Sequence, residues 1–168
     1  LAVFEDRIFV ADSKRHRIVI FDFYGRQVGG IGEHGDGPGQ FNCPTHMTTD
    51  RNGMLYVTDT MNFRVQMFDS GGRFVGAIGR QGDTSGRFSR PKGVGVDALG
   101  HVYVADGLFD NIQAFDRRGR FLLNFGKAGS EPGEFWLPNG IAISRDNRIF
   151  IADSYNRRVQ VLKCIGGP

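Results

Sequence analysis

The sequence predicts an all-β chain, a β-propeller built of four-stranded antiparallel blades with a 47-residue repeat. Two observations carry this prediction. Aspartates 12, 59, 106 and 153 each end an apolar run, and successive ones lie 47 residues apart. The chain also has 25 glycines in 168 residues and shows no segment with a helical period. A strand-rich, glycine-rich repeat of this length is typical of propeller blades rather than of helical solenoids.

Each copy of the repeat is expected to supply its strands in the same order. In the second copy, Asp50-Arg51-Asn52-Gly53 has the composition of a hairpin turn between the first two strands. Fourteen strands are expected, about 3.5 blades, because the first copy lacks an innermost strand and the last lacks an outermost one. The expected strands are 7–11, 17–22, 26–31, 46–50, 54–58, 64–69, 73–78, 93–97, 101–105, 112–116, 120–125, 140–144, 148–152 and 158–162.

The second strand of each copy is apolar on both faces, as in Leu55-Tyr56-Val57 and Val102-Tyr103-Val104. A strand with one face in water would alternate between apolar and polar residues. We therefore expect sheets stacked on both sides, as propeller blades are. Burial of each large side chain there would contribute roughly 1.5–3 kcal/mol.

The chain is expected to be a single propeller segment, residues 1–168, with repeats at about 1–40, 41–87, 88–134 and 135–168. Our preferred interpretation is that it is the C-terminal part of a longer propeller. Two alternatives remain: two half-rings that associate, or an open arc that binds a partner. An open arc exposes an apolar blade face at each end, which predicts self-association through the open blade edges.

Bulk properties narrow the function only a little. The net charge of +3 permits an acidic or nucleic-acid partner without requiring one. No apolar run approaches the ~20 residues that span a bilayer, so no membrane span is expected. Cys43 and Cys164 occupy different phases of the repeat, so we expect neither a disulfide nor a metal site from them.

The repeated motif resembles the NHL repeat over nearly the whole chain. The resemblance rests on Phe-x-x-Pro-x-Gly-Val-x-Val-Asp, then Val-Tyr-Val-Ala-Asp, then Asn-x-Arg-Val-Gln-x-Phe and Gly-x-Phe. It implies a propeller, usually of six four-stranded blades, which at this period needs about 280 residues. It also implies that the loop face of the blades binds partners, since some NHL proteins bind RNA there.

The residues that recur in every copy are interpreted as structural. Each repeated aspartate is followed five residues later by an arginine, except in the third copy, where Asn111 stands instead. A residue that every blade needs is better explained by the fold than by a site. Asp106, which lacks the arginine, is the one aspartate that invites a separate role. The structural positions are Asp12, Asp59, Asp106, Asp153, Arg17, Arg64 and Arg158.

The residues that differ between copies on the loop face are the candidate binding residues. Arginines interleaved with aromatic rings suit single-stranded nucleic acid, since rings stack on bases and cations neutralise phosphate. His46 replaces a glycine of the other copies at the channel mouth. The candidates are Arg15, His16, His46, Phe63, Arg80, Arg87, Arg90, Lys92, Phe109, Asn139, Tyr155 and Arg157.

The favoured hypothesis is a non-enzymatic interaction scaffold that binds a protein partner through this loop face. The first alternative is single-stranded RNA binding on the same face, and the second is a metal-dependent propeller lyase or hydrolase. We expect no catalytic residues, cofactor or metal ligands, because the sequence offers no nucleophile–base pair and no metal motif. His46 alone is suitably placed to be a metal ligand, and a site needs at least three.

Overall fold

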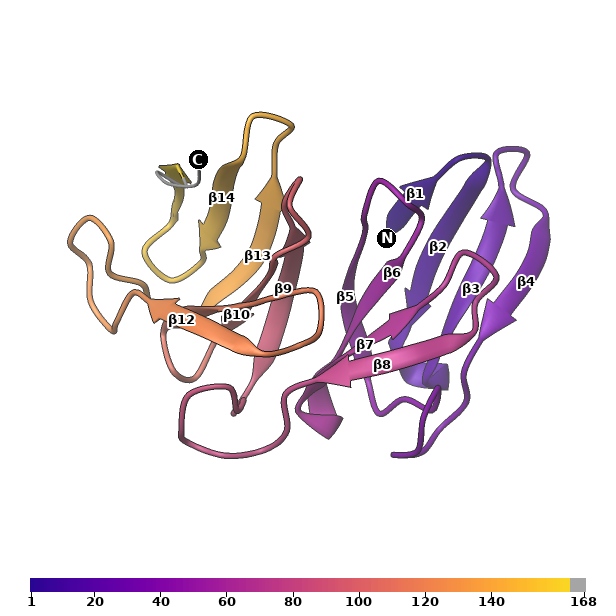
Figure 1. Ribbon diagram of the computed structural model, residues 1–168, viewed down its shortest axis with the longest axis horizontal. Coiled ribbons are helices and arrows are strands. Elements are labelled where there is room, and N and C mark those ends of the chain that lie inside the picture. The colour runs from indigo at the N-terminus through magenta and orange to yellow at the C-terminus, as the bar shows by residue number, and fades with distance from the viewer. Residues whose placement is uncertain (164–168) are drawn as a thin grey trace.

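The computed structural model describes residues 1–163, and Cys164 lies outside the described residues. Residues 1–163 form fifteen β-strands in four antiparallel sheets (Figure 1). Strand order within each sheet follows chain order, so every sheet is a simple meander. This is the all-β, partial-propeller architecture that the repeat predicts.

The first three sheets have four strands each, and the fourth has three. Two single-turn 3₁₀ helices lie between the second and third strands of the first two sheets, and no helix of the described residues is long and apolar enough to cross a membrane. The strands are β1 Ala2–Phe4, β2 Arg7–Asp12, β3 Arg17–Asp22, β4 Gln27–Ile31, β5 Pro44–Thr49, β6 Leu55–Asp59, β7 Arg64–Phe68, β8 Phe74–Ile78, β9 Pro91–Val96, β10 Val102–Asp106, β11 Asn111–Phe115, β12 Phe121–Phe125, β13 Pro138–Ile143, β14 Arg148–Asp153 and β15 Arg158–Lys163, and the helices are η1 Ser13–Arg15 and η2 Thr60–Asn62.

The prediction that the first copy lacks its innermost strand is wrong. Strand β1 pairs with β2 in register from Ala2↔Phe9 to Phe4↔Arg7. The hairpin turn between them is only two residues long, and Glu5 adopts a left-handed φ of 50° there. A three-residue strand without the preceding Phe-x-x-Pro loop carries too little pattern to be recognised in the sequence.

The sheets pack face to face, which explains why their second strands are apolar on both sides. Leu55 and Val57 of β6 belong to the core cluster shared with the first sheet, while Tyr56 between them belongs to the cluster shared with the third sheet. All five residues of β6, and all five of β10, are buried. The inner strands β5, β9 and β13 lie beside one another, as expected around a propeller axis.

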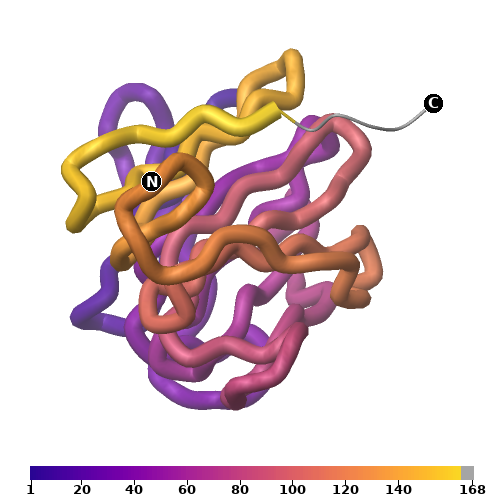
Figure 2. The backbone as a smooth tube through the Cα atoms, turned by 90° about the vertical axis from the view of Figure 1, so that its left-hand side faces the viewer, coloured from indigo at the N-terminus to yellow at the C-terminus, as the bar shows by residue number. Residues whose placement is uncertain are grey.

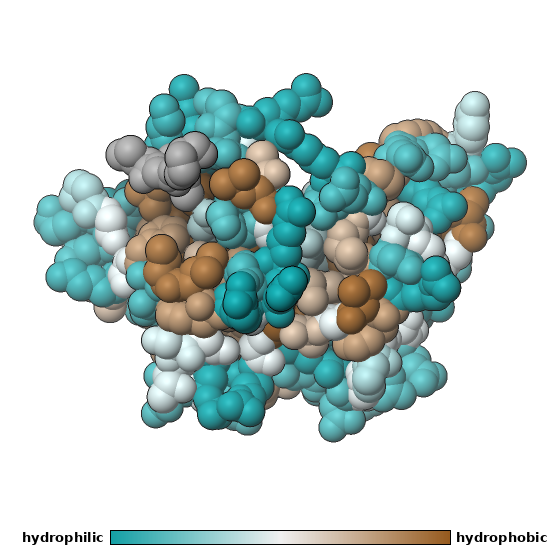
Figure 3. All heavy atoms as spheres, viewed as in Figure 1, coloured by the Kyte–Doolittle hydropathy of each residue, from teal (hydrophilic) through white to brown (hydrophobic). Residues whose placement is uncertain are grey.

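The two end sheets leave one face each uncovered by the described residues. On the first sheet, Val3 and Val28 are about half exposed. On the fourth sheet, Val159 and Val161 of β15 are likewise exposed. Figure 2 shows β15 running across the front of the molecule with no strand over it. Hydrophobic side chains on the face shown in Figure 3 occur in separate groups among hydrophilic ones.

The loop between blades is held by a phenylalanine that packs on a glycine. The ring of Phe88 lies where a Cβ of Gly79 would stand, and Gly79 has a left-handed φ of 81°. The same pairing joins Gly32 to Phe41 and Gly126 to Phe135. A side chain larger than hydrogen would displace the ring, which explains why a glycine lies against each phenylalanine of the Phe-x-x-Pro motif.

We predict that Phe88→Ala lowers the free energy of unfolding by about 3–5 kcal/mol, because it leaves a cavity beside Phe115. Phe88 is fully buried, and its ring centroid lies 5.6 Å from that of Phe115. Urea unfolding followed by circular dichroism measures the change. Val75→Ala, at an exposed position of β8, is the control and should leave the midpoint unchanged. Equal midpoints for both variants would contradict this account of the loop.

Candidate functional site

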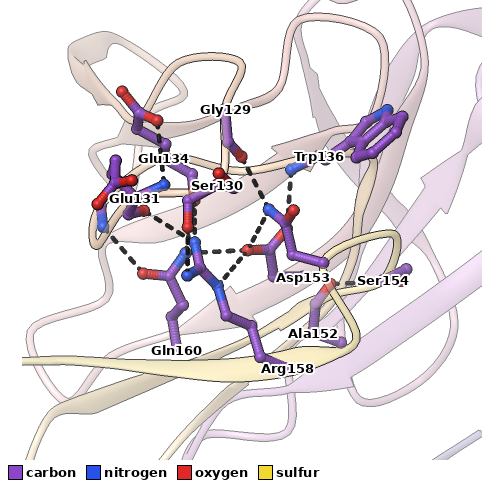
Figure 4. Close-up of polar contacts among 12 residues, drawn as sticks. Gly129, Ser130, Glu131, Glu134, Trp136, Ala152, Asp153, Ser154, Arg158 and Gln160 are labelled. Atoms are coloured by element: carbon purple, nitrogen blue, oxygen red, sulfur yellow. Dashed lines mark hydrogen bonds and ion pairs between the residues drawn. The ribbon is translucent and has the colours of Figure 1, made fainter.

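A buried carboxylate joins strand, turn and loop in the fourth blade (Figure 4). Asp153 Oδ2 accepts hydrogen bonds from Arg158 Nε at 2.8 Å, Asn156 Nδ2 at 2.9 Å and Gln160 Nε2 at 3.1 Å. Its Oδ1 accepts the backbone N–H of Trp136 at 2.8 Å. Burial by itself raises the pKa of Asp153, but these hydrogen bonds outweigh it and lower the pKa below its ordinary value.

The same side chains hold the loop that precedes the blade. Arg158 Nη2 donates to the carbonyls of Glu131 and Glu134, and Gln160 Nε2 also donates to the carbonyl of Glu134. In return, Gln160 Oε1 accepts the N–H of Gly133. We call the Asp, Arg and Gln of one blade its clamp. The second blade repeats it with Asp59, Arg64 and Gln66 on the loop of residues 32–43.

The third blade keeps its aspartate without an arginine. The carboxylate of Asp106 accepts four backbone N–H groups, those of Ser89, Arg90, Leu108 and Phe109, at 2.7–3.3 Å. The carboxylate is therefore fully engaged by the backbone of its own turn and loop. This geometry supports a structural role for Asp106 rather than the separate role considered from the sequence.

The first blade has an incomplete clamp. Val19 stands where the other blades have glutamine. Asp12 Oδ2 lies 3.7 Å from Arg17 Nε, which is buried and donates no hydrogen bond among the described residues.

A pocket of about 250 Å³ lies at the loop face between the third and fourth blades. It brings together four of the predicted binding residues: Arg90, Lys92, Asn139 and Tyr155. Neither cation forms an ion pair with a carboxylate of residues 1–163. Burial, and then the nearby charge of Arg90, lower the pKa of Lys92. The remaining lining residues are Gly107, Leu137, Pro138 and Ser154.

His46 lies at the end of a chain of hydroxyl groups. Thr60 donates its proton to the carbonyl of Pro91 at 3.0 Å, so it accepts from Thr45 at 2.7 Å. Thr45 then has no proton left and must accept from Nδ1–H of His46 at 3.2 Å. This leaves Nε2 of a neutral imidazole as an acceptor. Burial, followed by the charge of Lys92, lowers the pKa of His46, in agreement with a neutral ring.

The other predicted binding residues are spread over the loop face and do not join the pocket. Phe63 is half-buried against the core between the second and third blades, and Phe109 is also half-buried. His16 accepts the N–H of Cys43 at 3.0 Å, which ties the first blade to the second. Arg15 pairs with Asp12, and Arg87 donates to the carbonyl of Gln81. Arg80 and Arg157 are exposed.

Three features of this face were not predicted from the sequence. Gln66, Gln113 and Gln160 each bind the incoming loop, and their spacing of 47 residues was the available signal. Trp136 is exposed and stacks near Tyr155, with ring centroids 5.4 Å apart. Gly107 lines the pocket. Its difference from the other copies is visible in the sequence only when the four turns are aligned position by position.

The family comparisons agree with this fold. A family model of the NHL repeat matches residues 135–162, and a model described as a 6-bladed beta-propeller matches residues 1–54. The chain thus has a β-propeller fold and an NHL repeat at residues 135–162, in agreement with the resemblance of its motifs. No curated protein matches the sequence.

Solved structures share the fold at low identity. A streptogramin B lyase aligns with a TM-score of 0.73 and 16% identity, over 99% of this chain and 51% of that one. A protein of unknown function from Bacteroides thetaiotaomicron aligns with a TM-score of 0.74 and 17% identity, over 95% and 45%. Virginiamycin B lyase from Staphylococcus aureus aligns with a TM-score of 0.65 and 14% identity, over 96% and 53%. This chain spans about half the length of those structures, and such identities show the fold alone.

We predict that Arg64→Ala destabilises the protein by about 3–5 kcal/mol, because it leaves the carboxylate of Asp59 buried without its cation. The Arg64 side chain is 15% exposed and that of Asp59 is 0% exposed. The matched control is Arg73→Ala, which removes an 88%-exposed arginine from its pair with Asp69. Urea unfolding should show a large loss for the first variant and none for the second. Similar curves would mean that the clamp does not stabilise the blade.

We also predict that His46 titrates below its ordinary pKa of 6.5, because burial and Lys92 both disfavour the imidazolium. Lys92→Met should raise the pKa of His46, since it removes a neighbouring positive charge. NMR titration of the imidazole resonances measures both values. Lys14→Met, which removes an exposed cation elsewhere on the loop face, should leave the pKa unchanged. A histidine that is insensitive to Lys92 would refute this electrostatic coupling.

Proposed function

We propose that this propeller segment is a non-enzymatic interaction module that binds a protein partner through its loop face. The observation that carries the proposal is an exposed apolar set at one turn position of three successive blades. Met61, Leu108 and Tyr155 are spaced by 47 residues and are 54–60% exposed. Trp136, 53% exposed, stacks near Tyr155. We call these four side chains the apolar arc.

The apolar arc fits protein recognition better than chance exposure does. Single exposed apolar residues are normal on any surface, but here the same position is apolar in neighbouring blades. Aromatic and methionine side chains are enriched at protein interfaces, where they lose water on contact. The arc therefore offers anchors of the kind that bind a partner.

The repeated acidic groups of the second, third and fourth blades are engaged in holding the turns. The carboxylates of Asp59, Asp106 and Asp153 are buried and fully engaged in the turns. Residues 1–163 hold no group of three or more His, Cys, Asp or Glu side chains that could bind a metal ion. The lyases among the similar structures share the fold with this chain at 14–16% identity.

RNA binding is the second candidate, and it has one specific observation in its favour. Arg90 and Lys92 line the same pocket as Tyr155, whose ring is exposed. A ring beside cations can stack on a base while the cations bind phosphate. Such binding would weaken steeply with salt, which separates it from recognition by the apolar arc.

The test compares captured proteins between two variants of the immobilised chain. We expect Leu108→Ala/Tyr155→Ala to lose, by about tenfold or more, a protein that the wild type captures from ribonuclease-treated extract of the source organism. Quantitative mass spectrometry measures the loss, and the dissociation constant is then measured with that protein purified. The matched control is Leu122→Ala/Leu123→Ala on the outer strand β12, where both side chains are about half exposed.

Identical capture by the two variants would overturn the proposal. Suppose instead that a protein is captured from untreated extract but not from ribonuclease-treated extract, and that the amount of RNA recovered falls when Arg90 and Lys92 are replaced. That result would support the RNA candidate. Thermal unfolding of each variant checks that the fold is retained.

A further inference from the structure

One turn of the repeat has lost a hydroxyl group that ties neighbouring blades together. Ser13 donates to the carbonyl of Pro44 at 2.5 Å, and Thr60 donates to the carbonyl of Pro91 at 3.0 Å. Each bond runs from the first residue after the repeated aspartate to the proline of the next blade. The corresponding residue of the third blade is Gly107.

The missing side chain opens the pocket between the third and fourth blades. A Cβ on Gly107 would stand 3.4 Å from the carbonyl oxygen of Pro138 and 3.9 Å from Cγ of Lys92. Gly107 therefore lies where a hydroxyl would otherwise reach Pro138. The φ of Gly107 is not in the left-handed region, so its backbone does not require glycine. The glycine therefore provides space in the pocket and does not serve to relieve backbone strain.

The lining of the pocket carries two positive charges and no negative one. Arg90 and Lys92 both line it, and no carboxylate of residues 1–163 is among the lining residues. The carboxylates of Asp106 and Asp110 lie behind this lining and accept the backbone N–H groups of Arg90 and Leu137. Partial burial of Lys92 beside Arg90 costs free energy, which the lowered pKa of Lys92 reflects. An anion between the two cations would offset both the repulsion and the desolvation.

The rest of the lining suits a carboxylate carried on methylene groups. Leu137, Pro138 and the ring of Tyr155 provide apolar surface, while Asn139 and Ser154 provide polar groups. A pocket of about 250 Å³ has room for a short acidic side chain. Apolar walls with a few placed polar groups are typical of such sites.

We propose that the Gly107 pocket binds a carboxylate group, in the form of an acidic side chain that a protein partner presents to Arg90 and Lys92. The inference deepens the proposed function and rests on it for the source of the carboxylate. Tyr155 belongs both to the pocket and to the apolar arc, so one partner can contact the arc and place its acidic side chain in the pocket.

The experiment titrates the ¹⁵N-labelled protein with N-acetylglutamate and, separately, with inorganic phosphate. We expect N-acetylglutamate to shift the amide resonances of Gly107, Asn139 and Ser154 saturably. Lys92→Met should weaken its binding by about tenfold, since it removes a charge-assisted hydrogen bond. Gly107→Ser should abolish binding by filling the pocket while leaving both cations in place. Lys14→Met, the charge-matched control on the same face, should bind as the wild type does.

Three outcomes would overturn the inference: no saturable shifts, equal binding by the wild type and Gly107→Ser, or binding of phosphate alone. Thermal unfolding should show that Gly107→Ser is at least as stable as the wild type, since it restores a tie to Pro138. If Gly107→Ser fails to fold, the inference is still tested by comparing N-acetylglutamate binding between Lys92→Met and Lys14→Met. These titrations use no partner protein, so their failure differs from failure of the capture experiment.

Discussion

The carboxylate at the end of each second strand, buried in the second, third and fourth blades, is the interaction on which the rest of the structure depends. It accepts hydrogen bonds from its own turn and, in the second and fourth blades, holds an arginine against the carbonyls of the incoming loop. A buried charge of this kind is tolerated only when it is fully paired. Because the loop supplies part of that pairing, each blade is complete only when the chain that leads into it is correctly placed.

This arrangement separates the residues that build a blade from those that are free to differ. The clamp and the Phe–Gly contact use mostly buried groups, whereas the apolar arc uses exposed side chains of the turns and loops, and the pocket is lined by the turns and by the starts of the inner strands β9 and β13. The third blade shows how far the clamp can change: backbone N–H groups replace the arginine around Asp106. Stability and recognition can therefore vary independently on the same repeat.

The sequence predicted the architecture well, because period, apolar strands and turn residues all agree. It missed β1, since a three-residue strand before a two-residue turn leaves no periodic signal. It placed Arg90, Lys92, Asn139 and Tyr155 on one face, and the structure brings them into one pocket. It also proposed Phe63 as a binding residue of the loop face, and the structure shows this side chain half-buried against the core. Which way a turn side chain points depends on the blade beside it, and the pattern of one repeat does not contain that information.

The tie between Thr60 and Pro91 also shows how one position of the repeat can differ between blades without altering the clamp. The hydroxyl group fills the space between two blades but takes no part in the clamp. Its loss costs one hydrogen bond and opens a compartment whose walls come from two different copies of the repeat. In this architecture, the residue after the repeated aspartate distinguishes a turn that is tied to the next blade from one that lines a pocket beside it.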